Sequence, residues 1–390
     1  MTGLIERIGQ CIPGSPSDKT VWDELEKLLG AAFFSGMRAT QQNPIYHGEG
    51  DVLVHTQMVC RQLSENPAFH SLKTGQKTEL FLAAVFHDIG KVKSTRIENG
   101  NPVSPHHAST GSMIVRKFLW KNCGICGSPD LMTFRETVCT LVRWHMLPVH
   151  LPDQAETERK IRTVAAIGEL VPDFSWNLLC MLAEADVKGR IAEDISEGLM
   201  KVELSGLMAE DIGCLYRPNC FADSFTKHAY FSGRKVQPDQ TLFDNTWGEV
   251  IMLSGLPGTG KDTWIRELHF DIPMISLDDI RTELRIDPGD NQGEIIQTAY
   301  ERAREFLRKK QPFLWNATDL TKETRQKLVS LFEQYGASVR IVYLETNWEN
   351  RMKQNCGRKD AVQESAVEKM LGKTVPPTPD EAQIVEWICV

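Results

Sequence analysis

The spacing of apolar residues divides the chain into two parts. Within residues 18–212, apolar side chains recur every three or four positions, which is the period of an amphipathic α-helix. Stretches rich in Gly, Pro, Asn and Ser separate the periodic segments, as in PGSPS at 13–17. The pattern predicts an all-helical domain over residues 1–213. The helices are expected at residues 20–35, 51–64, 77–90, 107–121, 131–146, 157–170 and 174–190.

From residue 248 the pattern changes to short apolar runs that alternate with helical segments. This alternation predicts right-handed crossovers and a parallel sheet covered by helices, so residues 248–390 form an α/β domain. Residues 214–247 lack clear periodicity and mix aromatic with turn residues, which indicates a packed connector. Strands are expected at 249–253, 273–277, 312–315 and 339–344, and helices near 261–269, 279–286, 294–310, 321–335 and 347–355.

Composition adds limits on location and partners. The 390 residues are 41% hydrophobic and 25% charged, with no apolar run long enough to span a membrane. The N-terminal residues MTGLIERIGQ do not resemble a secretory signal, and ten scattered cysteines suit a reducing compartment, so a cytoplasmic location is expected. The net charge of −8 is shared equally by residues 1–246 and 247–390. This excludes a basic, sequence-blind nucleic-acid binder, and a nucleic-acid substrate would need a local patch.

Residues 253–264, LSGLPGTGKDTW, contain a glycine-rich phosphate loop. The loop follows an apolar strand and opens a helix, so backbone N–H groups and the helix dipole converge on phosphate. These features predict a site for ATP or another nucleoside triphosphate with Mg²⁺. A hydroxyl usually follows the lysine, but here Asp262 does, and Thr263 comes one residue later; we favour Asp262 as the Mg²⁺ ligand. The nucleotide-binding residues predicted are Gly255, Gly258, Thr259, Gly260, Lys261, Asp262 and Thr263.

The second apolar run of this half ends in SLDDIR, residues 276–281. Strand ends on this side of a parallel sheet face the bound ligand, so Asp278 can accept the proton of a hydroxyl and Arg281 can bind an anion. Asp is a favoured N-cap residue, and we expect Asp279 to cap the following helix. The third strand ends in NATD, which fits poorly with the magnesium-holding acid of a switch or motor ATPase.

The helical half contains short islands of histidine and carboxylate. The islands are VLVHT, FHDIGK, SPHHASTG, RWH and EADVKGR, and Lys91 is the last residue of FHDIGK. Imidazole with carboxylate is a ligand set of transition metals rather than of Mg²⁺ or Ca²⁺, so one or two ions such as Mn²⁺, Ni²⁺, Co²⁺, Fe²⁺ or Zn²⁺ are expected. His87 and Asp88 are adjacent and can share one metal only near a helix end, which Gly90 permits. The candidate ligands are His55, His87, Asp88, His107, His145 and Asp186.

The motifs GLPGTGKDTW, DDIR, NATDLT and NRMKQNCGRKDAV resemble the polynucleotide 5′-hydroxyl kinase family, over nearly all of residues 248–375. The resemblance implies that Lys261 binds the β- and γ-phosphates. It also implies that Asp278 is the general base toward the 5′-hydroxyl and that Arg281 contacts the neighbouring phosphate.

The last of these motifs is similar to the lid of that family. By resemblance, Arg358 stabilises charge on the transferring phosphoryl group, and Arg351 is a supporting residue that packs the lid. Family members usually have proline after the valine that follows the lid, whereas here Val362 is followed by Gln363.

The order H…HD…D resembles the HD phosphohydrolase superfamily, over about residues 45–200, whose members cleave phosphoesters with a metal-activated water. The four shared ligands match His55, His87, Asp88 and Asp186. His107 and His145 match positions that some members use for a second metal, or they contact phosphate or donate a proton. Lys91 is expected to face the substrate phosphate.

A narrower resemblance comes from HGEGDVLVHT, HDIGK, HHASTGS and EADVKGR, which are similar to the HD domain attached to tRNA nucleotidyltransferases. That domain acts on 2′,3′-cyclic and 2′-phosphates. Larger relatives that hydrolyse nucleoside triphosphates stay open as an alternative.

Together the two resemblances imply an enzyme that acts on both ends of broken RNA or DNA, with a separate ligase acting downstream and no membrane partner. The expected reactions are hydrolysis of 2′,3′-cyclic phosphate and 2′-phosphate ends and ATP-dependent phosphorylation of 5′-hydroxyl ends. One alternative is an HD nucleotidase paired with a nucleoside or sugar kinase. Another is a regulatory module with a nucleotide-sensing HD half.

Overall fold

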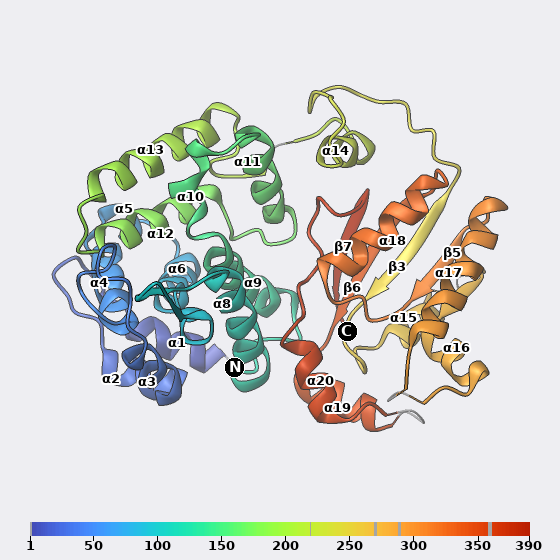
Figure 1. Ribbon diagram of the computed structural model, residues 1–390, viewed down its shortest axis with the longest axis horizontal. Helices are drawn as coiled ribbons and strands as arrows, with labels where there is room; N and C mark the ends of the chain where they lie inside the picture. Colours follow the sequence, from blue (N-terminus) through green and yellow to red (C-terminus); the bar gives the residue numbers. More distant parts are fainter. Residues whose placement is uncertain (1, 219, 269–270, 288–289, 358–360) are drawn as a thin grey trace. The chain divides into compact units, whose positions relative to one another are not determined.

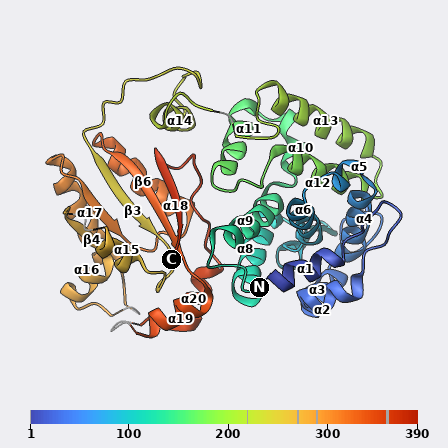
Figure 2. The same cartoon turned by 180° about the vertical axis from the view of Figure 1, so that it is seen from behind.

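A computed structural model describes residues 2–218, 220–268, 271–287, 290–357 and 361–390. Figures 1 and 2 show the chain from opposite sides. It divides into two compact units, Met1–Ile125 with Asp130–Asn219, and Cys126–Pro129 with Cys220–Val390. Among the described residues, no helix is both long and apolar enough to cross a membrane.

The first unit is helical, as the apolar spacing predicts. The predicted helix 20–35 is interrupted at Gly30, where φ is +93° and the chain turns between two shorter helices. A small hairpin of β1 (Arg96–Glu98) and β2 (Asn101–Val103) was not predicted. The helices are α1 (Thr2–Gln10), α2 (Trp22–Leu29), α3 (Ala31–Ala39), α4 (Val52–Glu65), α5 (Pro67–His70), α6 (Thr74–Phe86), α7 (Lys91–Ser94), α8 (His107–Lys117), the π-helical turn η1 (Phe118–Asn122), α9 (Pro129–Trp144), α10 (Leu147–His150), the 3₁₀ turns η2 (Leu151–Asp153) and η3 (Ile167–Glu169), α11 (Thr157–Ala166), α12 (Trp176–Lys188) and α13 (Ile195–Asp211).

Helix α6 lies at the centre of this unit. Every residue from Thr78 to Phe86 is buried, and α4 and α12 both pack against it. The helix ends at Phe86, four residues before the end of the predicted segment, so His87 and Asp88 lie in a turn. Gly90 in that turn has an ordinary φ of −65°. It is needed for another reason, because a Cβ there would come within 2.0 Å of the His107 carbonyl oxygen on α8.

The second unit contains a five-stranded parallel sheet with the order β4-β5-β3-β6-β7, in agreement with the predicted α/β class. Strand β7 and helix α20 were not predicted. The strands are β3 (Glu249–Ser254), β4 (Met274–Ser276), β5 (Phe313–Asn316), β6 (Ser338–Glu345) and β7 (Ile384–Cys389). The helices are α14 (Ser224–Phe231), α15 (Lys261–Glu267), α16 (Leu277–Leu284), α17 (Gly293–Arg308), α18 (Lys322–Gln334), α19 (Trp348–Cys356) and α20 (Glu364–Leu371).

Helices cover both faces of this sheet, because successive side chains of a strand point to opposite faces. On β3, Val250 and Met252 join a core with α16, α17 and α18. Ile251 and Leu253, on the other face, pack with residues of α15. The strands run parallel, so the carboxyl ends of β3, β4 and β5 lie along one edge, where ligands bind in such sheets.

The segment before β3 belongs to this second unit. His228 on α14 is hydrogen-bonded to Glu333 on α18. The indole N–H of Trp247 donates to the carbonyl oxygen of Tyr335 at 2.8 Å, and the backbone N–H of Trp247 donates to Gly336 at 3.1 Å. These bonds attach α14 and the end of the segment to α18 and the turn after it.

Candidate active sites

The six candidate metal ligands of the helical unit lie together, although they come from five parts of the chain. His55 is on α4, His87 and Asp88 follow α6, and His107 opens α8. His145 follows α9, and Asp186 is on α12. All six residues are buried, with at most 8% of their surface exposed. Packing of the helix ends around α6 therefore gathers donors that are far apart in sequence.

Asp88 occupies the centre of the cluster. Its Oδ2 lies 3.3 Å from His87 Nε2 and 3.6 Å from His55 Nε2. Its Oδ1 lies 3.3 Å from His107 Nε2 and 3.8 Å from His145 Nε2. The two carboxylate oxygens thus face two different sets of imidazoles, and each set with Asp88 is compact enough to hold one ion.

Backbone carbonyl groups orient three of these imidazoles. Nδ1 of His87 bonds Ala84 O at 2.8 Å, and Nδ1 of His145 bonds Val142 O at 2.9 Å. His107 Nδ1 is bonded to a carbonyl in the same way. A carbonyl oxygen can only accept, so Nδ1 carries the proton and Nε2 presents its lone pair, as metal-bound histidines require. Burial, reinforced by His87, lowers the pKa of His145 to about 3 and keeps this imidazole neutral.

The carboxylates are ionised despite their burial. Burial by itself favours the neutral acid, but Lys91 and His87 hold the pKa of Asp88 well below its ordinary value. Asp186 Oδ1 lies 3.0 Å from His55 Nε2, and Arg190 pairs with the same carboxylate at 2.6 Å. These two neighbours outweigh burial and also hold the pKa of Asp186 far down. Ionised carboxylates beside imidazoles whose Nε2 atoms face them are a donor set that fits a divalent transition metal.

Three side chains that were not predicted, Gln42, His47 and Glu49, lie beside the cluster. Glu49 Oε1 lies 2.9 Å from His55 Nδ1 and 2.8 Å from His47 Nδ1. Burial raises the pKa of Glu49, but the two imidazoles lower it more, so the carboxylate stays charged. Lys91 Nζ lies 2.7 Å from Asp88 Oδ2 and donates to Gln42 at 2.6 Å. The only sequence signal for Glu49 is its place in the motif HGEG at 47–50, two residues after His47.

In the second unit, the glycine-rich loop joins β3 to α15. Gly255 and Gly258 both have positive φ, +149° and +82°. A Cβ on Gly255 would lie 2.5 Å from the Leu344 carbonyl oxygen, and one on Gly258 would lie 2.6 Å from that of Arg351. Glycine is therefore required at both positions, by conformation and by close approach.

Lys261 opens α15 and is 8% exposed. Its ammonium donates to the carbonyl oxygens of Gly255 at 2.8 Å and Leu256 at 2.9 Å. The cation is thus held over the loop itself, where a triphosphate would offer stronger, charged acceptors.

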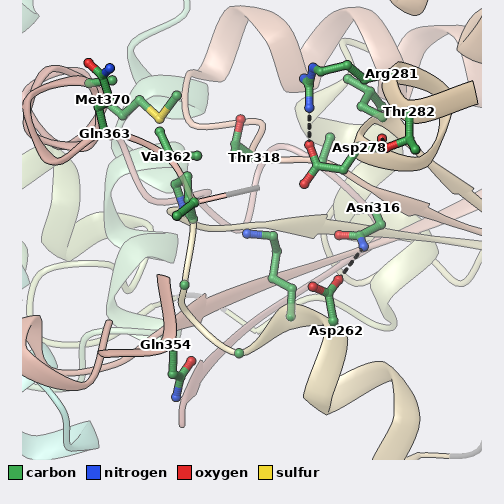
Figure 3. Close-up of a pocket in the computed structure, with 18 of the residues that line it drawn as sticks. Asp262, Asp278, Arg281, Thr282, Asn316, Thr318, Gln354, Val362, Gln363 and Met370 are labelled. Atoms are coloured by element: carbon green, nitrogen blue, oxygen red, sulfur yellow. Dashed lines mark hydrogen bonds and ion pairs between the residues drawn. The ribbon is translucent and has the colours of Figure 1, made fainter. Parts of the chain in front are cut away.

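The residues after Lys261 have different surroundings. Asp262 Oδ1 accepts from Asn316 Nδ2 at 2.9 Å, at the carboxyl end of β5 (Figure 3). The hydroxyl of Thr263 accepts from Arg266 one turn later on the same helix at 3.2 Å. Asp262 therefore presents hard oxygen atoms beside the strand ends, which is the donor type that Mg²⁺ prefers.

Asp278 and Arg281 line the same pocket as the glycine-rich loop. This pocket has a volume of about 1360 Å³. They form an ion pair on the first turns of α16, across the pocket from Gln363 (Figure 3). Arg281 also donates to Gln292 at 3.1 Å. The expectation that Asp279 caps this helix is wrong. Ser276 is the N-cap, and its hydroxyl accepts from the backbone N–H of Asp279 at 3.2 Å.

The segment expected to form a lid is described only in part, and Arg358 lies outside the described residues. Arg351 is fully buried, pairs with Glu364 at 2.6 Å and stacks on the Trp348 ring at 4.1 Å. It does not line the pocket. The Asn355 side chain bonds both the backbone N–H and the carbonyl of Val362, which fixes the two ends of the segment between them.

Each half of the chain matches a known protein family. Residues 52–167 match the family described as HD domain, and residues 250–377 match a family described as AAA domain. No curated protein matches the chain. The chain therefore has an N-terminal helical HD domain followed by an α/β domain of the P-loop kinase type. Both kinds of domain are typical of enzymes, and the buried His and Asp cluster fits the divalent metals that HD domains bind.

Proposed function

We propose that this protein heals both ends of a broken nucleic acid. Its α/β domain would phosphorylate 5′-hydroxyl ends with ATP, and its HD domain would hydrolyse 2′,3′-cyclic phosphate and 2′-phosphate ends. The observation that carries the proposal is the Asp278–Arg281 pair, which faces the phosphate loop within one pocket. A carboxylate beside a phosphate-binding cation suits an acceptor hydroxyl that has a phosphate next to it.

In the kinase reaction, Asp278 takes the proton of the 5′-hydroxyl, and the freed oxygen attacks the γ-phosphorus. The bond to the β,γ-bridging oxygen breaks, and ADP leaves. Arg281 exchanges its bond to Asp278 for the neighbouring phosphate of the acceptor, which frees the carboxylate to act as base. Lys261 neutralises charge on the β- and γ-phosphates, and Arg358 is proposed to act on the transferring group.

In the phosphoesterase reaction, water adds to phosphorus, one ester P–O bond breaks, and that ribose oxygen leaves as a hydroxyl. The six ligands would hold the divalent metal ions, which when bound would supply an activated water and offset phosphate charge. Lys91 lies at the edge of the cluster, where its ammonium can bind a phosphate oxygen. The two reactions are complementary, because a break that leaves a 2′,3′-cyclic phosphate leaves a 5′-hydroxyl on the other side. A separate ligase would then join the healed ends.

The proposal is tested with end-labelled RNA and DNA oligonucleotides that carry a 5′-hydroxyl and a 2′,3′-cyclic phosphate. Incubation with Mg²⁺ and ATP should phosphorylate the 5′ end, and incubation with Mn²⁺ or Ni²⁺ should open and remove the cyclic phosphate. Unchanged ends, together with phosphorylation of free nucleosides or sugars, would instead indicate a small-molecule kinase paired with a nucleotidase.

Asp262 is expected to hold Mg²⁺ in the kinase site. Asp262→Ser should keep kinase activity, because a hydroxyl is the usual donor at this position, whereas Asp262→Ala should raise the Mg²⁺ concentration needed for half-maximal rate. The measurement is a Mg²⁺ titration of the 5′-kinase rate at fixed ATP. Equal and full activity of both variants would assign the role to Thr263, and Thr263→Ala would then show the raised requirement.

Glu49 is expected to support metal binding through His55. Glu49→Gln removes the charge that orients this imidazole, so affinity for Mn²⁺ should fall about 10- to 100-fold. Calorimetric titration of the metal-free protein measures this without any substrate. Glu65→Gln, at the end of the helix that carries His55 and paired with Arg61 and Gln62, is the matched control. An unchanged Mn²⁺ affinity in Glu49→Gln would show that the imidazole is oriented without it.

A further inference from the structure

One face of α16 supplies an ordered row of polar side chains to the kinase pocket. Asp278, Arg281, Thr282 and Arg285 all line it, and their spacing of three and four residues places them on the same side of the helix. Figure 3 shows Arg281 and Thr282 beside Asp278. The row therefore begins at the carboxylate of the proposed general base and continues with two cations toward the end of the helix.

Arg285 has an unusual backbone conformation. It is the C-cap of α16, with φ +55° and ψ +40°, and its N–H donates to the carbonyl oxygens of Arg281 and Thr282. The left-handed region costs about 1 kcal/mol or more for a residue with a Cβ, and glycine is the usual residue at such helix ends. An arginine here destabilises the helix end relative to glycine. Such a cost suggests that the side chain of Arg285 has a function.

The guanidinium of Arg285 forms no ion pair within the described part of the chain. No carboxylate or amide there pairs with its guanidinium, whereas Arg281 is bonded to Asp278 and Gln292. The nearby Arg302 on α17 is also paired, to Glu283 at 2.6 Å. A solvent-exposed guanidinium that lines a phosphate-handling pocket is free to bind an anion that enters with the substrate.

Cations slightly outnumber carboxylates in the pocket, although the protein as a whole is acidic. Its described lining includes four cations, Lys261, Arg266, Arg281 and Arg285, against three carboxylates, Asp262, Asp278 and Asp287, while the whole chain has a net charge of −8. Lys261 and the loop would face the triphosphate. Arg281 and Arg285 follow Asp278 along the helix, on the acceptor side. Four residues of helix advance by about 6 Å, so the two guanidinium groups follow one another as phosphates do along a strand.

We infer that Arg285 binds the second phosphate of a nucleic-acid acceptor, so that Asp278, Arg281 and Arg285 meet the 5′-hydroxyl, the first phosphate and the second phosphate in that order. This inference rests on the proposed kinase function and deepens it. It makes Arg285 a specificity-determining residue that favours a strand with at least two phosphodiesters over a nucleoside or a dinucleotide.

The test compares two acceptors that have a free 5′-hydroxyl, a dinucleotide with one phosphodiester and a trinucleotide with two. In the wild type, kcat/KM should rise about tenfold from the first to the second, the expected contribution of one charge-assisted hydrogen bond. Arg285→Gln should remove this rise and leave the dinucleotide unchanged. Arg285→Lys should restore part of it, because the cation is kept.

A second measurement separates phosphate binding from folding. The affinity for a labelled single-stranded oligonucleotide is followed against salt, and loss of one phosphate contact should make the log–log slope shallower by about 0.7. Arg285→Gly relaxes the backbone at the helix end, so it should fold at least as well as wild type and still show the shallower slope. Arg302→Gln, outside the pocket, is the control and should change neither readout.

Three outcomes would overturn the inference. In the first, Arg285→Gln loses equal activity on both acceptors, which means that it acts on ATP or on folding. In the second, the wild type phosphorylates both acceptors equally well. This result would agree with the proposed kinase function but contradict binding of a second phosphate by Arg285. In the third, the wild type phosphorylates no oligonucleotide, and the proposed function falls with it.

Discussion

Asp278→Asn is expected to lower the rate of 5′-phosphorylation by about 10²- to 10⁴-fold, the usual contribution of a positioned general base. The amide keeps the size of the side chain but cannot take a proton from the acceptor hydroxyl. Its partner Arg281 remains anchored by Gln292, so the pocket should keep its form. Single-turnover transfer of labelled phosphate from ATP to an oligonucleotide measures the loss, and KM for ATP should not change.

Asp279→Asn provides a matched control for this experiment. Asp279 is the adjacent carboxylate on the same helix turn, but it does not line the pocket and does not cap the helix. It should keep full kinase activity, and Asp278→Asn should keep full phosphoesterase activity. Equal losses in the two variants would mean that the charge of the helix start matters rather than a specific base. Undiminished kinase activity of Asp278→Asn would show that Asp278 is not the general base.

The second large effect is expected from Asp88→Asn in the HD domain. Asp88 faces both sets of imidazoles, so an amide in its place removes the negative charge from both proposed metal positions and leaves one oxygen that can serve only one of them. Several kcal/mol of metal assistance correspond to about a thousandfold or more in the phosphoesterase rate. The rate on 2′,3′-cyclic phosphate ends is measured together with metal content by mass spectrometry, and both should fall while kinase activity stays.

Loss of Asp88 also leaves the buried Lys91 without its carboxylate partner, which destabilises a domain by about 3–5 kcal/mol in comparable cases. Thermal denaturation must therefore confirm that the HD domain is folded at the assay temperature. Asp153→Asn, an exposed carboxylate of the same domain that pairs with Lys201, is the control and should bind metal normally. Wild-type metal content and activity in Asp88→Asn would contradict the shared-ligand arrangement.

Much of the fold could be predicted from local patterns. Side-chain periods of 3.6 and 2 depend only on neighbouring residues, so most helices and the strands β3 to β6 were found near their observed positions. The half-buried strand β7 was missed because its burial is uniform, without an alternating pattern. The break at Gly30 and the early end of α6 are local backbone events inside continuous apolar spacing, which periodicity does not register.

The candidate sites were predictable to a different degree. The phosphate loop is one continuous segment, so its spacing in sequence nearly determines its geometry. The metal cluster is not continuous, since His55 and Asp186 are 131 residues apart and lie within 3.0 Å. Residue types indicated which side chains would meet. The contact of Glu49 with His55 was not foreseen, because a glutamate on a loop is ordinarily solvated.

The sequence by itself determined the chemistry available to this protein, namely a phosphate loop, an acceptor carboxylate with a cation, and a set of imidazole and carboxylate ligands. These depend on residue type and on local spacing, which the chain carries whatever its tertiary fold. Only the tertiary structure decided that Asp88 lies between two sets of histidines, and that Arg285 follows Arg281 into the pocket. Such placements depend on how helix ends pack and where a helix stops, which are set by contacts between distant segments.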